Sequence, residues 1–141
     1  MTINQIISGF KSIAKSHPQI RSFKTGNSVT ADSVKEYPLM CVRIESSNPQ
    51  EYLVNHSFRL LILDLPTHDK SDTVNIQSDC FETLNDVLTI LEDYPEFEAI
   101  TITLGSNATP VDVANADGAA GYEILLSVNV NRNRCVNLCN D

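Results

Sequence analysis

The residues best suited to chemistry gather between an apolar run and a following helical pattern. Asp64, His68 and Asp72 lie there, each four residues from the next. If this segment folds back, two carboxylates and an imidazole would meet, and such a set suits a divalent ion or acid–base work. Asp and Pro are equally what an ordinary turn requires. We interpret the segment as an ordinary turn and keep the metal or acid–base site as the alternative.

The four cysteines do not complete a metal site. Cys135 and Cys139 form a CxxxC pair that would lie on one face of a helix. No histidine or second cysteine pair lies near them to complete the four ligands that zinc takes. Cys41 and Cys80 lie among apolar neighbours, where a free cysteine behaves as a small hydrophobic residue. We expect structural or incidental cysteines, and metal or disulfide use of the CxxxC pair is the alternative.

Recognisable enzyme motifs are absent from the sequence. It contains no GxGxxG, GxxxxGK[ST], GxSxG or HExxH. The GAAG run at 118–121 precedes a strand pattern, so it lacks the helix dipole that phosphate-binding loops use. His56 is expected as a hydrogen-bonded, half-buried residue on a strand, and His17 at a helix end. We expect no catalysis and no cofactor.

Two amphipathic helices are expected to support the other elements. The N-terminal TINQ fits a capping box, apolar residues then recur at three- and four-residue steps, and His17-Pro18 ends the helix. The second helix is expected over Thr73–Tyr94, where Pro95 stops it. Its apolar face comprises Ile76, Cys80, Leu84, Val87, Leu88 and Leu91.

Alternating residues predict the strands. We expect them at Tyr37–Glu45, Glu51–Leu65, Phe97–Leu104 and 122–130, and the polar connection at 19–36 leaves room for a short one at Ile20–Lys24. The turn at 46–50 would join the first two as a long hairpin. Leu60–Leu63 is apolar on both faces, so both faces should be covered there.

The order helix, two strands, helix, two strands predicts one α+β domain over 1–141. Its sheet would be antiparallel or mixed, with about four strands and both helices packed on one face. Residues 105–121 would form a flexible loop before the last strand, and 132–141 a polar tail.

Charge and composition exclude several classes of function. The chain carries a net charge of −8, and ten of its acidic residues but one basic residue fall within 64–98. Lys and Arg are scattered without interleaved aromatics, so a grip on nucleic acid is not expected. No apolar run approaches the roughly 18 residues of a membrane span. The N-terminus lacks the pattern of a signal peptide, which favours a cytosol-like compartment.

Taken in this order, the chain resembles a family of tailed-bacteriophage structural proteins, the tail-completion or tail-terminator proteins of the head–tail neck. The N-terminal helix and polar stretch lead to Tyr37-Pro38-Leu39, as in that family. RLLILDLPTHDKSDT (59–73) is similar to its strand and Asp-containing turn, and NIQSDCFETLNDVLTILED (75–93) to the helix that follows. ADGAAGYEILLSVNV (116–130) is similar to the entry to its final strand.

The resemblance implies a virion protein made in the host bacterial cytoplasm. Such proteins form a ring, often six-fold, that caps the tail tube or joins it to the connector. The implied partners are other copies of the chain, with a hexamer favoured, and other neck, connector or tail proteins. DNA would pass as non-specific cargo, and no membrane is involved. If an acidic face at Asp79, Glu82 and Asp86 lines the lumen, its negative charge would repel the phosphate backbone and keep DNA from adhering.

Ring assembly would give the loop at 105–121 a role, because long loops are often functional and Ala, Gly and Asn allow close approach. The expected contact residues are Asn107, Pro110, Asp112, Asn115, Asp117, Gly118 and Gly121. A merely flexible surface loop is the alternative here. For the whole protein, the alternatives are a small intracellular adaptor that binds a partner through a strand edge and, less favoured, a metal-dependent enzyme.

Overall fold

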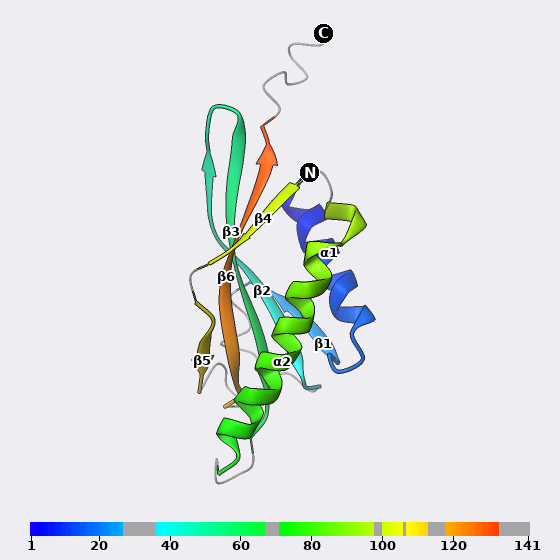
Figure 1. Ribbon diagram of the computed structural model, residues 1–141, viewed down its shortest axis with the longest axis vertical. Coiled ribbons are helices and arrows are strands. Elements are labelled where there is room, and N and C mark those ends of the chain that lie inside the picture. The colour runs from blue at the N-terminus through cyan, green and yellow to red at the C-terminus, as the bar shows by residue number, and fades with distance from the viewer. Residues whose placement is uncertain (27–35, 67–70, 98–99, 106, 113–117, 133–141) are drawn as a thin grey trace.

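The computed structural model describes residues 1–26, 36–66, 71–97, 100–105, 107–112 and 118–132. These residues form an α+β fold, as predicted (Figure 1). The elements, in chain order, are α1 (Ile3–Ser16), β1 (Ser22–Thr25), β2 (Leu39–Pro49), β3 (Leu53–Asp64), α2 (Thr73–Glu92), the 3₁₀ turn η2 (Pro95–Phe97), β4 (Ile100–Leu104), β5 (Thr109–Val111) and β6 (Ala120–Asn131).

The strands within the described residues form one mixed sheet with six strands, in the order β1-β2-β3-β6-β4, and β5 also pairs with β6. β1 runs parallel to β2, and every other pair is antiparallel. The expected number of about four strands is therefore wrong. β1 has four residues and β5 has three, too few for an alternating pattern to predict a strand with any force. β5 also lies inside the segment predicted as a loop.

Both helices begin and end close to where the sequence predicts. The Gln5 N–H donates to Thr2 Oγ1 at 3.2 Å and the Thr2 N–H to Gln5 Oε1 at 2.7 Å, which completes the capping box of α1. α2 ends at Glu92, two residues before the expected end. The strand expected to start at Phe97 starts instead at Ile100, as β4. Phe97 lies in η2.

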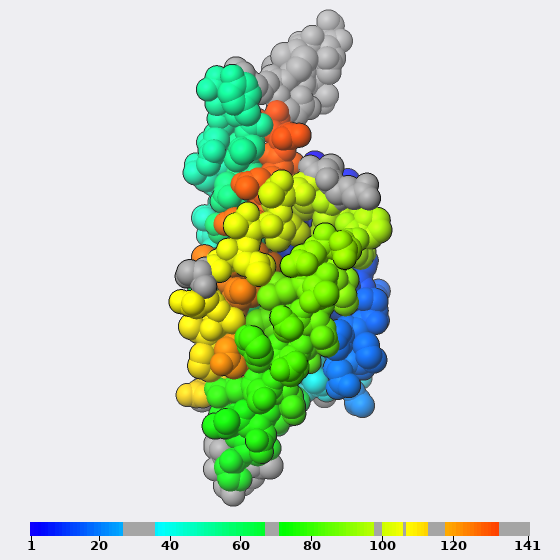
Figure 2. Space-filling model, viewed as in Figure 1, coloured from blue at the N-terminus to red at the C-terminus, as the bar shows by residue number. Residues whose placement is uncertain are grey.

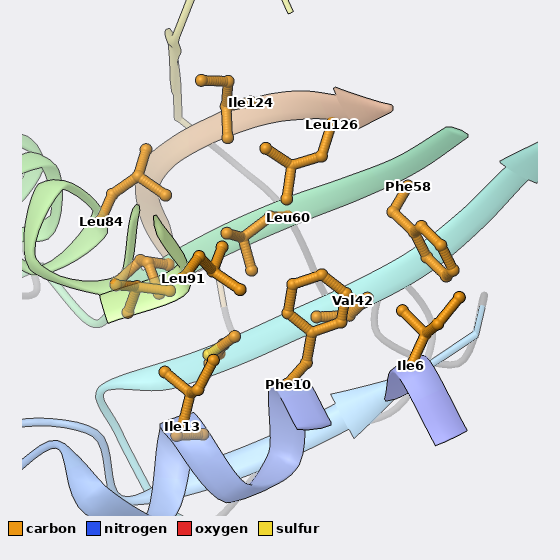
Figure 3. Close-up of a cluster of buried hydrophobic side chains, with 14 of the residues drawn as sticks. Ile6, Phe10, Ile13, Val42, Phe58, Leu60, Leu84, Leu91, Ile124 and Leu126 are labelled. Atoms are coloured by element: carbon orange, nitrogen blue, oxygen red, sulfur yellow. The ribbon is translucent and has the colours of Figure 1, made fainter. Parts of the chain in front are cut away.

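The two helices cover the same face of the sheet (Figure 1). Figure 3 shows Phe10 of α1 and Leu91 of α2 reaching toward Val42 and Leu60 of the central strands. The Phe10 ring lies 5.7 Å from that of Phe58 and 5.8 Å from that of Phe97, centroid to centroid. This aromatic cluster joins α1, β3 and η2 into one core.

The opposite face of the sheet has a smaller buried cluster at one end. It comprises Leu39, Cys41, Leu61, Leu63 and Ala119. All four residues of Leu60–Leu63 are buried, so the prediction that both faces are covered at this end of the strand is confirmed.

The β2–β3 hairpin is confirmed, but its turn is displaced. The register shifts between Ile44 and Ser46, so Glu45 is an extra residue in β2. Beyond this bulge the pairing continues to Pro49 opposite Val54, and the turn lies at 50–52 rather than at the predicted 46–50. Residues 46–55 form a hairpin arm that rises beyond both helices (Figure 1).

Phe10→Ala should lower the free energy of unfolding by about 3–5 kcal/mol, since it leaves a cavity where a fully buried ring contacts two others. Phe81 provides a matched control because it is 41% exposed and, among the described aromatic rings, contacts that of Tyr122 edge-on at 5.1 Å. Phe81→Ala should cost about 1 kcal/mol. Urea unfolding of both variants measures the difference, and equal losses would contradict the assignment of Phe10 to the core.

Candidate functional site

The segment predicted as a flexible contact loop is partly a strand. Pro110 lies in β5, where it pairs with Tyr122 of β6. Asn107, Pro110 and Asp112 are exposed, as a contact surface requires. Asn115 and Asp117 lie outside the described residues. Within the described part of the segment, Thr109–Val111 is therefore held against β6, and Ala120 and Gly121 belong to β6 itself.

Gly121 is a correction to the prediction. It is not in a loop but in β6, opposite Leu63, and it is buried. A Cβ at this position would run into the carbonyl oxygen of Ile62. The glycine is therefore needed for close strand packing and cannot contact a partner. Gly118 has a φ of 74°, a left-handed conformation that glycine adopts without strain, and it turns the chain into β6.

Asp112 is tied to the second helix. The Gln77 side-chain amide donates to Asp112 Oδ1 at 2.8 Å and to the Val111 carbonyl at 3.2 Å. These bonds hold the end of β5 against α2. No pattern in the sequence signals this pair, because the two residues are 35 positions apart.

Three acidic residues of α2 predicted to form one face, Asp79, Glu82 and Asp86, are all exposed. They line one hollow of about 410 Å³, together with Asp64, Gln19 and Pro38. Asp86 Oδ2 also lies 3.0 Å from Nε2 of the buried His17. Asp86 is therefore partly occupied in joining the two helices, while no such bond engages Asp79 or Glu82 among the described residues.

The hydrogen bonds of His17 define its tautomer. The Gln19 N–H donates to Nδ1 at 3.1 Å, so Nδ1 carries no proton in this arrangement. The proton then lies on Nε2 and is donated to the Asp86 carboxylate. The predicted helix end at His17 is confirmed, and the residue has an additional role in attaching α1 to α2.

The proposed ion-binding set is only partly described, because His68 lies outside the described residues. Within the parts of the chain that are described, no three His, Cys, Asp or Glu side chains come close enough together to hold a metal ion. Burial raises the pKa of Asp64, and the nearby Asp79 and Asp72 carboxylates add to this effect. The Leu65 N–H, which donates to Asp64 Oδ1 at 2.8 Å, acts in the opposite direction.

Cys41 and Cys80 are buried free thiols, as predicted. Burial raises the pKa of each to about 12, which leaves both protonated and unreactive at neutral pH. Cys135 and Cys139 lie outside the described residues. His56 is buried more deeply than predicted, at 8% exposure, and its Nδ1 lies 2.7 Å from Ser47 Oγ.

An ion-pair network that the sequence does not signal crosses the helix-free face. Glu45 Oε1, at the bulge, accepts from Arg59 Nε at 2.6 Å and from Arg43 Nη2 at 3.0 Å. Arg59 Nη1 also donates to Glu123 Oε1 at 3.0 Å. The bond from Arg59 is the main cause that lowers the pKa of Glu45. The network spans three strands and fixes the bulge.

A second hollow, of about 450 Å³, lies between the C-terminal half of α2 and β4. We call it the α2–β4 groove. Its apolar lining residues include Leu88, Leu91, Tyr94, Ile100 and Ile102, and the exposed Glu92 and Asp93 also line it. Leu104, at the same groove, is 48% exposed. A hollow lined by both apolar side chains and exposed carboxylates suits the docking of a protein surface.

None of the helices within the described residues is long and apolar enough to cross a membrane. Comparison of the chain with models of known protein families and with curated proteins finds no match. The function therefore has to be inferred from the residues and surfaces of this chain.

Asp64→Asn tests the burial of Asp64, because it keeps the acceptor for the Leu65 N–H and removes ionisation. The folded state holds the Asp64 proton more tightly than the unfolded chain, so this group lowers stability as pH rises above its ordinary pKa of 3.8. The stability gained by the variant should therefore increase from acid to neutral pH.

Urea unfolding across that pH range measures the gain. Glu96→Gln, which changes an exposed carboxylate in η2, corrects for the loss of one negative charge. A gain that shrinks as pH rises would show that Asp64 is not held in its protonated form by the fold.

Proposed function

We propose that the protein is a virion structural subunit of the head–tail junction of a tailed bacteriophage. Copies of it form a ring, with a hexamer favoured, that terminates the tail or joins it to the connector and lets DNA pass. The observation that carries the proposal is a sheet with an open strand at each end. Among the described strands, none pairs with the outer side of β1 or of β4.

Open strands at both ends favour repeated assembly. An unpaired edge presents a row of free backbone donors and acceptors that a neighbouring chain can use. Because β1 and β4 lie at opposite ends of one sheet, each copy can contact one neighbour on each side. Contacts between two different surfaces produce a closed ring when the rotation between copies closes.

The acidic hollow fits a passage for DNA. Asp79 and Glu82 are exposed and no ion pair engages them within the described residues. Like charge between these carboxylates and the phosphate backbone would prevent adhesion of the DNA. A ring repeats this charge in every subunit, so the effect would be multiplied around the lumen.

Native mass spectrometry of the purified chain over a concentration series should show one discrete ring-sized species. Immunolabelling of intact phage particles should then place the protein at the neck. A monomer at every concentration would contradict spontaneous ring formation, and label distributed over the capsid or along the tail would contradict the location.

Asp79→Lys with Glu82→Lys should slow DNA packaging and ejection, because the reversed charges would attract the phosphate backbone. Asp86 is left unchanged because it is bonded to His17. Packaged DNA per particle and ejection rate are the measurements, with Asp79→Asn and Glu82→Gln as the neutral control. Packaging and ejection at the unmodified rate in the lysine variant would show that this face does not line the passage.

A further inference from the structure

Charge is strongly segregated along this chain. Met1–Gly26 contains Lys11, Lys15, Arg21 and Lys24 and no acidic residue. The described segment 71–97 has the opposite composition, with no basic residue and seven acidic ones: Asp72, Asp79, Glu82, Asp86, Glu92, Asp93 and Glu96. The fold converts this sequence pattern into a spatial one, because the first segment forms α1 and β1 and the second forms α2 and η2.

The basic and acidic segments border different hollows of the surface. β1 lies at one end of the sheet and β4 at the other. Figure 2 shows α1 in blue on one side of α2, with β4 and β5 in yellow on the other. The surface formed by α1 and β1 is therefore basic, and the acidic C-terminal end of α2 borders a separate surface next to β4.

The basic surface has a shallow apolar hollow of about 160 Å³ between α1 and β1. Lys11, Lys15 and Arg21 surround it, and Ile20 and Phe23 contribute its apolar lining. The three basic side chains are exposed. None of them has an ion-pair partner within the described part of the chain. We call this surface the α1–β1 flank.

The α2–β4 groove has the complementary properties. Its lining residues Glu92 and Asp93 are exposed and form no ion pair with other described residues. Apolar side chains line it as well, and among them Leu104 is 48% exposed. A docking partner therefore needs apolar side chains flanked by positive charge, which is what the α1–β1 flank offers.

We propose that the α2–β4 groove of one copy receives the α1–β1 flank of the next copy. This proposal rests on the proposed ring, for which it names the two contacting surfaces. The basic side chains Lys11 and Arg21 meet the Glu92 and Asp93 carboxylates of the neighbour, and the apolar linings of the two hollows are buried together. The two surfaces are different, so the contact is head-to-tail, and each copy keeps one of each for its two neighbours.

The test reverses charge on one surface at a time. One variant carries Lys11→Glu and Arg21→Glu, and the second carries Glu92→Lys and Asp93→Lys. Lys15 is left unchanged because it lies in the last turn of α1, where positive charge stabilises the helix. Each variant alone would place like charges across every contact, so the ring population in sedimentation velocity should fall by at least about tenfold.

Mixing the two variants provides the decisive result. The acidic flank of the first then fits the basic groove of the second, and the basic flank of the second fits the acidic groove of the first. Rings should therefore reappear with the two chains alternating. Recovery also shows that both variants are folded, and a chain with all four substitutions should form rings by itself.

Asp79→Lys with Glu82→Lys is the matched control, because it makes the same change in charge on the same helix outside the groove. It should leave the ring population unchanged. Rings of the wild-type chain that persist in both charge-reversal variants, or that are lost and do not return on mixing, would overturn these two surfaces while leaving the ring itself intact. A wild-type chain that forms no ring at any concentration would instead overturn the proposed function together with this contact.

Discussion

The antiparallel pairing of β3 with β6 is the constraint on which the rest of the structure depends. It aligns Leu53–Asp64 with Ala120–Asn131 over the full length of both strands. A slip of one residue would turn Phe58 and Leu60 away from the helices and bring Arg59 under them. Gly121 helps to exclude such a slip, because only a residue without a side chain fits against the Ile62 carbonyl. Both helices then pack on the face that this register makes apolar.

The sequence predicts the elements whose signals are local. The capping box and apolar stripe define α1, and alternation of apolar and polar residues defines β3 and β6. The sequence leaves β1 open as a possible short strand and misses β5. Strands of four and three residues are too short to show an alternation of apolar and polar residues. The bulge at Glu45 moves the hairpin turn, and that bulge is fixed by Arg43 and Arg59, which are recognised as its partners only after the strands are paired.

The candidate site is less predictable than the fold because it depends on distant residues. His17 and Asp86 are 69 positions apart, so the sequence shows two unrelated polar residues where the fold makes one link. Gly121 was expected at a contact surface because glycine suits a flexible loop, but glycine equally suits a close approach of strands. From the sequence, the apolar residues of the α2–β4 groove are predicted to be ordinary core residues. Only the arrangement of α2 and β4 shows that they border an open hollow.

The hairpin arm has a consequence for how the shape of this protein can change. Neither of the described helices α1 and α2 covers residues 46–55. The arm is held by strand pairing, by the Asn55–Asn129 side-chain bond and by the bonds from Arg132 to its turn. Strand side chains alternate between the two faces of the sheet with a period of two residues. Adding two residues to each strand of the arm would therefore leave every other side chain on the face it occupies now. The arm would then extend by about 7 Å without altering the core. Its reach can therefore diverge among related chains independently of the body that supports it.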